Sequence, residues 1–170
     1  MINIALIWRL GTEFEVKKHA HILREGQRAD QLYFVKNGLV RLYYLRDGKE
    51  ITDWFGTPGT YLTSIPGFYG HASGEHYIQA LEDSVIHAIP RSTIEKECAD
   101  DTQMAVAYRD IIIQHLLRLQ ERITALQFYT AKERYELLLK KNPLVIQRAP
   151  RTHIASYLGI SLETLSRVSV

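Results

Sequence analysis

The spacing of hydrophobic positions changes once along the chain. From Val16 to about Ile89, short runs of aromatic and β-branched residues alternate with turns that contain glycine or proline. Turn signals stand between such runs at Asn37–Gly38 and Asp47–Gly48, and both are typical of β-hairpins because these residue types tolerate positive φ. Many short strands at this spacing predict an antiparallel sandwich or roll.

After Pro90 the spacing becomes helical. Residues 99–128 contain neither glycine nor proline, which predicts one long helix of about 45 Å. Its second half has apolar residues at alternating intervals of four and three, as in a coiled coil, at Ile112, Leu116, Leu119, Ile123 and Leu126. We call these five residues the seam. One interpretation is a helix that packs only on its own β-domain, with Ile111, Ile113 and Leu117 on a second face. We expect both faces to be used, which favours a parallel homodimer.

The last forty residues have the pattern of a small helical module. Thr130 and Glu133 form a capping-box pattern that opens a helix, and Asn142–Pro143 ends it. Residues 151–168 then have the pattern of a helix-turn-helix, in which Thr152 can cap the first helix and Ser161 the second. The turn falls on Gly159, and the residues expected to bury the two helices against each other are Ile154, Ala155, Leu158, Ile160, Leu165 and Val168. The alternative is a helical hairpin with a purely structural role.

Charge favours a nucleic-acid partner over that alternative. The net charge is only +2, yet residues 131–170 hold seven of the 21 Lys and Arg residues and three of the 19 Asp and Glu residues. A basic tail on a mildly acidic body is typical of a DNA-binding module. No apolar run approaches the roughly 18 residues of a membrane helix. With a single cysteine, Cys98, we expect a reduced, cytoplasmic protein without a membrane partner.

Together these segments resemble the Crp/Fnr family of bacterial transcription regulators. The matching motifs are Glu25–Gly26, Leu32–Gly38, Asp47–Gly48, Glu133–Tyr135, Ile154–Ile160 and Glu163–Arg167. The last two are the most specific, and they look most like regulators of Bacteroidetes-type bacteria. The resemblance implies an α+β fold. An antiparallel β-roll of the cyclic nucleotide-binding (jelly-roll) type would cover residues 1–98. A dimerisation helix over 99–129 and a helix-turn-helix domain over 130–170 would follow.

The function that this resemblance implies is a homodimer that binds a palindromic double-stranded DNA operator through a recognition helix over residues 161–169. The base-reading positions fall on Glu163, Ser166 and Arg167, which share one face of a helix. Arg167 can donate two hydrogen bonds to guanine, and Glu163 can accept one from cytosine. A surface ion pair between these two is the alternative. We expect Thr152, Ser161 and Thr164 to contact phosphates.

The resemblance also implies two further partners, RNA polymerase and a small-molecule effector that binds the roll. At the positions where a cyclic nucleotide would bind, however, the sequence departs from the family pattern. Ser64 replaces the glutamate that meets the ribose, and the phosphate element, expected near Gly74–His76, lacks its arginine. A buried phosphate without that arginine costs several kcal/mol, so we do not expect tight binding of cAMP or cGMP. The cysteines of an iron–sulfur switch are also absent, so no cofactor is expected. Haem stays open because histidines are present at His71, His76, His87 and His115, although each is more often an ordinary surface or hydrogen-bonded histidine. Cys98 is a candidate redox sensor, but a lone cysteine beside a helix start is more often inert packing.

Two rival functions stay open. His19, His21 and Glu25 resemble half of the metal motif of cupins, which are also jelly rolls. However, no later glycine-rich element supplies the remaining histidine of the cupin motif at a usable spacing, and we expect neither a metal site nor an enzyme.

The second rival is a sensor that does not bind DNA. The chain ends at Val170, soon after the recognition helix, where family members continue into a β-wing. A wing that is lacking or truncated allows a sensor that acts only through protein contacts.

Overall fold

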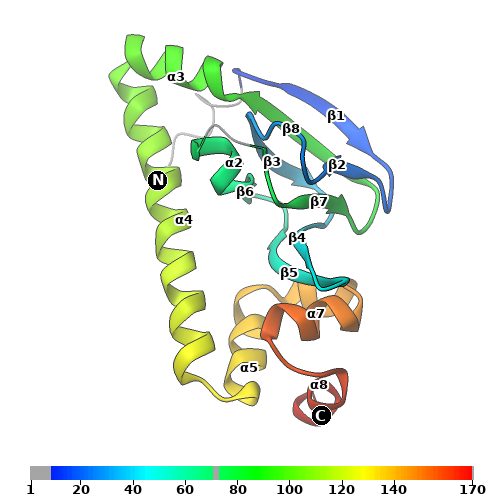
Figure 1. Ribbon diagram of the computed structural model, residues 1–170. Helices are drawn as coiled ribbons and strands as arrows, with labels where there is room; N and C mark the ends of the chain where they lie inside the picture. The colour runs from blue at the N-terminus through cyan, green and yellow to red at the C-terminus, as the bar shows by residue number, and fades with distance from the viewer. Residues whose placement is uncertain (1–8, 71–72, 170) are drawn as a thin grey trace.

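The computed structural model describes residues 9–70 and 73–169, and two antiparallel four-stranded sheets form the upper part of the molecule (Figure 1). The strand order is β1-β8-β3-β6 in one sheet and β2-β7-β4-β5 in the other. The strands are β1 (Thr12–Val16), β2 (His21–Leu23), β3 (Gln31–Asn37), β4 (Val40–Arg46), β5 (Lys49–Gly56), β6 (Tyr61–Leu62), β7 (Tyr77–Ala80) and β8 (Ser84–Pro90). This confirms the expected β-roll.

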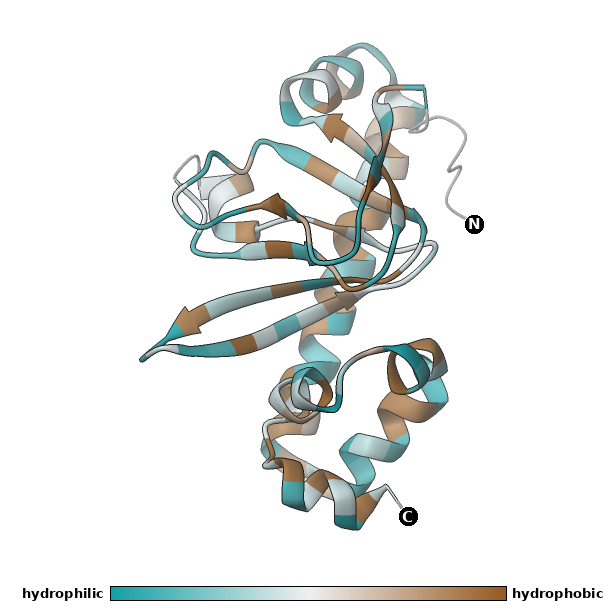
Figure 2. Ribbon diagram, turned by 90° about the vertical axis from the view of Figure 1, so that its right-hand side faces the viewer, coloured by the Kyte–Doolittle hydropathy of each residue, from teal (hydrophilic) through white to brown (hydrophobic). Residues whose placement is uncertain are grey.

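The two sheets enclose one hydrophobic core. Val35, Val40, Ile78 and Ile86 are fully buried in it. Figure 2 shows hydrophobic and hydrophilic residues mixed along the β4–β5 ribbon, and the first four residues of β4 are all buried, the charged Arg41 among them.

One of the two predicted hairpins is confirmed. Asp47 and Gly48 join β4 to β5, with φ of 51° and 73°, and Arg46 pairs directly with Lys49. Positive φ at both central residues is the geometry of a tight hairpin turn.

The other predicted hairpin, at Asn37–Gly38, is wrong. β3 pairs with β6 and β8, whereas β4 pairs with β5 and β7, so the chain crosses from one sheet to the other at this point. Gly38 has φ of 97°, and a Cβ atom there would clash with the Ser84 hydroxyl. Glycine is therefore needed for a tight crossing beside β8.

The helices of the sensor half are α2 (Ile65–Gly70), α3 (Arg91–Asp100) and α4 (Thr102–Phe128). The long helix was expected from Ala99, but it begins at Thr102. Asp101 is in an extended conformation, and its side chain accepts hydrogen bonds from the backbone N–H groups of Gln103 and Met104. This cap separates α3 from α4. The division of the chain at residues 98 and 129 stays a prediction.

α4 runs along one side of the molecule, and the first half of the helix is buried against the roll (Figure 1). Met104, Ala107 and Ile111 are buried there among residues of β3, β8, α2 and α3. Ile113 and Leu117, which were expected on this face, are exposed by 44% and 63%. They follow Ile111 by two and six positions, which places them on other sides of a helix.

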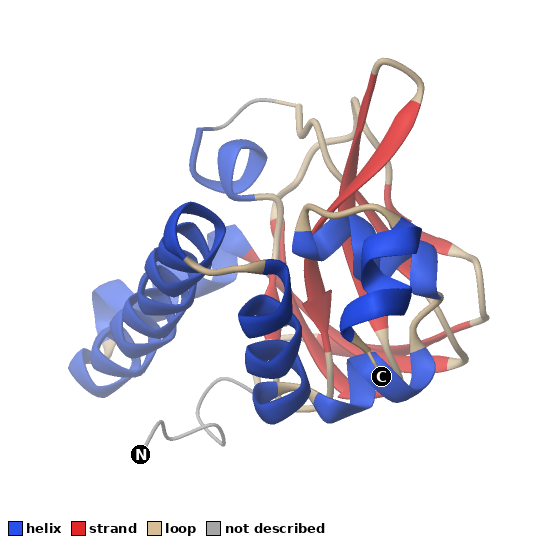
Figure 3. Cartoon of the chain, turned by 90° about the horizontal axis from the view of Figure 1, so that it is seen from below, coloured by secondary structure: helices blue, strands red, loops and turns tan. Residues whose placement is uncertain are grey.

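The chain then turns back into a module of four helices, α5 (Ala131–Lys141), α6 (Pro143–Arg148), α7 (Arg151–Leu158) and α8 (Leu162–Val168). The capping box of Thr130 and Glu133 is present as predicted. The module shares one buried cluster with the roll, since Leu39, Phe55 and Leu81 pack together with residues of α5 to α8. Viewed from below (Figure 3), the module lies in front of the sheets and α4 lies to one side.

Candidate nucleic-acid interface

The helix-turn-helix forms from α7, a left-handed turn and α8. Gly159 has φ of 65° and ψ of 39°, and its N–H group donates to the carbonyls of Ala155 and Ser156. The Ile160 N–H also donates to the Ala155 carbonyl, at 3.0 Å. These bonds close the end of α7 in the manner of a glycine C-cap. The predicted turn is therefore confirmed.

The two predicted helix caps have different outcomes. The Ser161 hydroxyl accepts a hydrogen bond from the Thr164 N–H at 3.1 Å and so caps α8. The prediction for Thr152 is wrong, because α7 already begins at Arg151 and Pro150 holds the cap position without a side-chain bond. Thr152 is exposed within the first turn of α7.

The recognition helix α8 has one buried face and one exposed face. Leu165 is only 1% exposed and anchors the helix to the module. On the other face, the side chains of Glu163 and Arg167 are 81% and 69% exposed, and Ser166 is exposed beside them. The three predicted base-reading residues therefore lie together on a free surface.

Glu163 and Arg167 also form the ion pair that was the alternative interpretation, with 3.6 Å between Nη1 and Oε1. A second Arg167 nitrogen, Nη2, donates to the Thr164 hydroxyl at 3.3 Å. Ion pairs this exposed contribute little to stability. The pair thus orients the arginine without preventing it from binding another acceptor.

Arg151 is a further residue of this surface, and the sequence patterns did not single it out. Its Nη2 atom donates to the hydroxyls of Ser166 and Ser169, at 3.3 and 3.1 Å, so it spans from α7 to α8. The one available signal was its place directly after Pro150, at the start of a helix. Arg151 adds a second positive charge beside Arg167.

α7 is attached to the β4–β5 ribbon by hydrogen bonds that sequence patterns did not predict. The Ser156 hydroxyl accepts from the Thr52 N–H at 2.9 Å and donates to the Glu50 carbonyl at 3.2 Å. β5 is an edge strand, so these backbone groups have no neighbouring strand to pair with. Ser156 supplies the missing partner, and we call this contact the α7–β5 contact.

Arg122 connects the same two elements to α4. Its guanidinium donates to the carbonyls of Tyr157, at 2.9 Å, and Thr52, at 3.4 Å. The central carbon of the guanidinium also lies 4.1 Å from the centre of the Tyr157 ring. The long helix, the edge strand and the helix-turn-helix therefore meet at one side chain.

Replacing Ser156 with alanine tests the α7–β5 contact. We expect the free energy of unfolding to fall by about 1–3 kcal/mol, because the Thr52 N–H loses its partner. Urea denaturation measures this loss, and hydrogen exchange at Thr52 should become faster. Ser92→Ala, at an exposed serine of α3, is the matched control and should change stability by less than about 0.5 kcal/mol. Unchanged stability and unchanged Thr52 exchange in Ser156→Ala would show that the contact is not formed in solution.

A buried arginine lies at the edge of the same interface. Arg41 is 1% exposed, and its Nη2 atom donates to Glu50 at 2.7 Å and to Gln79 at 3.0 Å. His153 of α7 lies 4.0 Å from the Glu50 carboxylate. Burial, and then the charge of Arg41, lower the pKa of His153 to about 4. His153 is therefore neutral at pH 7, and its side chain adds no positive charge next to Arg41.

The predicted dimer seam lies open along α4. Ile112, Leu116, Ile123 and Leu126 are exposed by 39–62%, and Leu119 is half-buried. A row of large apolar side chains in contact with water is typical of an interaction surface. Pairing of two chains through this seam stays a prediction.

The two positions where a nucleotide-binding member would hold ribose and phosphate are bonded to each other in this chain. Ser64 is fully buried, and its hydroxyl lies 3.0 Å from Nδ1 of His76. Burial lowers the pKa of His76, although Asp53 and Glu75 act in the opposite direction. A cavity between β6, α2 and α4, which neither Ser64 nor His76 lines, has a volume of about 60 Å³, well below the roughly 300 Å³ of small ligand sites.

The residues of the cupin-like motif do not converge. His21 Nε2 lies 3.0 Å from the Tyr43 hydroxyl, whereas Glu25 accepts a hydrogen bond from Tyr77. Within residues 9–70 and 73–169, no group of His, Cys, Asp and Glu side chains is arranged to hold a metal ion. Of the histidines considered for haem, His71 lies outside the described residues.

Cys98 packs against the cluster of α3 and α4. Burial, and then Asp101 and Glu97, raise the pKa of its thiol. A thiol with a raised pKa is less reactive, which does not favour a redox sensor. In the part of the chain that the structure describes, no helix combines the length and the apolar character that crossing a bilayer requires.

Comparison with known proteins identifies the family. Residues 13–101, just over half of the chain, match the cyclic nucleotide-binding domain family. The nitrogen fixation regulation protein FixK of Azorhizobium caulinodans is 27% identical over 93% of this chain and 67% of its own length. The anaerobic regulatory protein of Bacillus subtilis is 27% identical over 75% of this chain. The chain spans about two thirds of the first relative and 54% of the second.

A solved structure agrees over almost the whole chain. FixK2 of Bradyrhizobium japonicum is 28% identical, with a TM-score of 0.79 over 94% of this chain and 82% of its own. These relatives are regulators by name, not enzymes, which supports the expectation of a non-enzyme over the cupin-like alternative. The narrower likeness to Bacteroidetes-type regulators stays a prediction. The chain belongs to the cyclic nucleotide-binding domain family and, within it, to the Crp/Fnr transcription regulators.

Proposed function

We propose that the protein acts as a homodimer that binds a palindromic DNA site through α8. The observation that carries this proposal is the free face of α8, where Glu163, Ser166 and Arg167 lie exposed opposite the buried Leu165. This face lies at the end of the molecule away from α3 (Figure 1). A helix that projects in this way can enter the major groove without a clash with its own roll.

The surface supports separate roles for its residues. Arg167 would bond the edge of a guanine, with Glu163 on the paired cytosine and Ser166 as a further base contact. Ser161 and Thr164 lie at the N-terminus of α8, where hydroxyl and N–H groups favour a phosphate. Thr152 and Arg151, in the first turn of α7, are further phosphate contacts in this proposal.

Two chains joined through the seam would bring their recognition helices to successive major grooves, about 34 Å apart. The two-fold symmetry of such a dimer requires an inverted repeat in the DNA. RNA polymerase is a further partner in this proposal, and the cytoplasm is where such a protein would meet DNA.

The β-roll would act as the sensor domain, with the α7–β5 contact and Arg122 as its connection to the helix-turn-helix. An effector that favours one arrangement of these contacts would change the affinity for DNA. The bond between Ser64 and His76 supports a different effector from cAMP, because it occupies both positions of the nucleotide motif. No tightly bound cofactor is part of the proposal.

Selection from random double-stranded DNA tests the proposed function. We expect enrichment of an inverted repeat with half-sites about one helical turn, or 10 bp, apart. Binding to it should weaken steeply as salt rises, because phosphate contacts release counterions. The same selection with the protein omitted is the control. A pool without an enriched repeat would contradict the proposal and favour a sensor that acts through protein contacts alone.

A further inference from the structure

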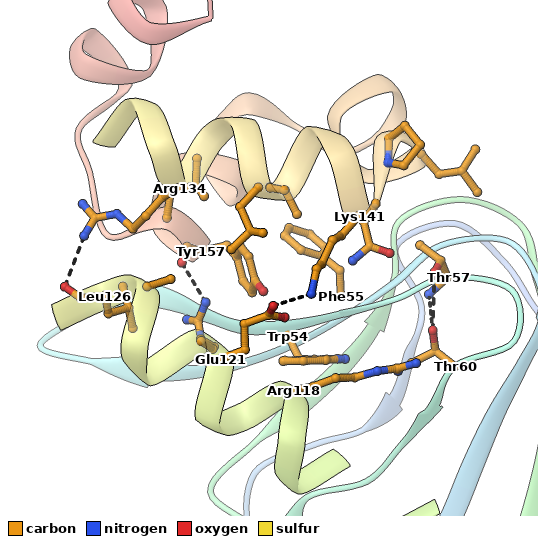
Figure 4. Close-up of a pocket in the computed structure, with 18 of the residues that line it drawn as sticks. Trp54, Phe55, Thr57, Thr60, Arg118, Glu121, Leu126, Arg134, Lys141 and Tyr157 are labelled. Carbon is orange, nitrogen blue, oxygen red and sulfur yellow. Dashed lines mark hydrogen bonds and ion pairs between the residues drawn. The ribbon is translucent and has the colours of Figure 1, made fainter. Parts of the chain in front are cut away.

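A larger cavity of about 600 Å³ lies between the roll, the long helix and the helix-turn-helix module (Figure 4). Its wall is formed by β5 and the turn that follows it, by α4, by α5 and by the end of α7. This volume is in the range of sites that hold small organic molecules. It is separate from the nucleotide positions, since neither Ser64 nor His76 lines it.

The wall is apolar over much of its area. Trp54 and Phe55 of β5, Leu137 and Leu138 of α5, and Tyr157 of α7 contribute to it. The Phe55 and Tyr157 rings lie 5.4 Å apart, and Trp54 lies 6.5 Å from Tyr157. Aromatic walls of this kind favour a ligand with a flat or extended hydrophobic body.

The charged residues of the wall are mostly positive. Lys141 is paired with Glu121, the one acidic residue that lines the cavity in the described part of the chain. Arg122 donates only to the backbone carbonyls described above, and Arg134 donates to the Leu126 carbonyl at 3.3 Å. Carbonyl groups do not neutralise a guanidinium, so these two charges have no acidic partner in the part of the chain that the structure describes.

Two guanidinium groups have unused hydrogen-bond donors. Nε of Arg134 is buried and has no partner among the described residues. Arg118 of α4 has neither a hydrogen bond nor an ion pair within residues 9–70 and 73–169, and Figure 4 shows it beside Trp54 on the wall opposite α5. Burial, and then the charge of Arg118, lower the pKa of the neighbouring His115. The buried Nε of Arg134 and the exposed guanidinium of Arg118 therefore offer positive charge and free donors beside the apolar wall.

We propose that this cavity binds an amphipathic organic anion, with its hydrophobic body against Trp54 and its acidic group on Arg118. Such a ligand would touch β5, α4, α5 and α7 together. It would change the relative stability of their arrangements and so the position of α8. This consequence rests on the proposed function, whereas binding itself does not.

The first test uses 8-anilinonaphthalene-1-sulfonate, an aromatic anion whose fluorescence rises in apolar sites. For this test Trp8 is replaced with phenylalanine (Trp8→Phe), so that Trp54 is the single tryptophan of the chain. We expect saturable binding of one dye per chain, together with quenching of Trp54 emission. The neutral dye N-phenyl-1-naphthylamine should bind more weakly, because it cannot use the charge of Arg118.

Variants of Arg118 then separate this cavity from the exposed apolar seam. Arg118→Gln should weaken binding of the anionic dye by about tenfold or more, since a charge-assisted hydrogen bond is lost. It should leave binding of the neutral dye unchanged. Arg118→Lys, which keeps the charge, should stay within about threefold of the parent. Arg109→Gln, on the same helix and paired with Asp110 outside the cavity, is the matched control.

Thermal unfolding of each variant shows that the comparison is made between folded proteins. Equal dye affinity in Arg118→Gln and its parent would overturn the proposal, and so would an equal loss in Arg109→Gln. No DNA is present in this experiment. Failure of dye binding therefore leaves the proposed DNA function standing, and failure of DNA selection leaves the cavity proposal standing.

Discussion

Replacing Arg167 with alanine is expected to remove most of the discrimination between the operator and other DNA. A bidentate contact between arginine and guanine contributes about 1–3 kcal/mol, and a palindrome contains it twice. The loss of about 2–6 kcal/mol corresponds to at least about 30-fold in affinity. Arg167 is 69% exposed and has only weak local partners, so the free energy of unfolding should change by less than about 0.5 kcal/mol.

Fluorescence anisotropy at one salt concentration, with the operator and an unrelated duplex, measures this effect. Lys140→Ala removes the same charge from an exposed position of α5 and is the control. It should weaken binding to both duplexes alike, because a distant charge acts on DNA without regard to sequence. A ratio of operator to unrelated affinity that stays unchanged in Arg167→Ala would mean that α8 does not read bases.

Replacing Leu116 with glutamate is expected to prevent the chain from forming a dimer. Leu116 is the most exposed residue of the seam, at 62% in the single chain. Pairing would bury one carboxylate from each chain against apolar side chains, at a cost of several kcal/mol for each. Sedimentation velocity should show a monomer at micromolar concentration. Operator affinity should fall by about 100-fold or more, because the two half-sites are no longer bound by one particle.

Leu117→Glu is the matched control for this experiment. Leu117 is 63% exposed, almost the same as its neighbour, but it lies outside the seam. We expect this variant to remain a dimer with nearly unchanged DNA binding. If both variants dissociate, or if neither does, the seam is not the dimer interface.

The comparison of Asn37–Gly38 with Asp47–Gly48 shows how far local patterns predict the fold. Both pairs have the residue types of a tight turn, and both contain positive φ. Only the second joins neighbouring strands, because the partner of a strand is chosen by the packing of whole sheets. The turn residues therefore predicted where the chain changes direction, but not which strand it meets next.

The same distinction holds along α4. The lack of glycine and proline correctly predicted a long helix, and the interval of four and three residues predicted an apolar row along it, since both are local properties. The interval did not predict which further positions contact the roll. Ile111 does so, whereas Ile113 and Leu117 do not. Which residues of α4 contact the roll depends on how the two sheets are placed relative to the helix.

For the candidate site, the recognition face was predictable and its surroundings were not. The positions of Glu163, Ser166 and Arg167 follow from helical spacing and from the turn at Gly159. Arg151 was missed because its bonds to Ser166 and Ser169 depend on how α7 crosses α8. The crossing angle between α7 and α8 cannot be derived from the spacing of residues along the chain.

The sequence by itself determined the elements whose stabilising groups are close neighbours along the chain. These are the capping box of Thr130 and Glu133, the turn at Gly159, the cap at Ser161 and the two faces of α8. Only the tertiary structure decided that Ser156 bonds an edge strand 104 residues away, and that Arg118 and Trp54 line one cavity. The reason is that local hydrogen bonds are specified by residue type and spacing. Contacts between distant segments depend on which backbone groups and surfaces the packed sheets and helices leave unpaired.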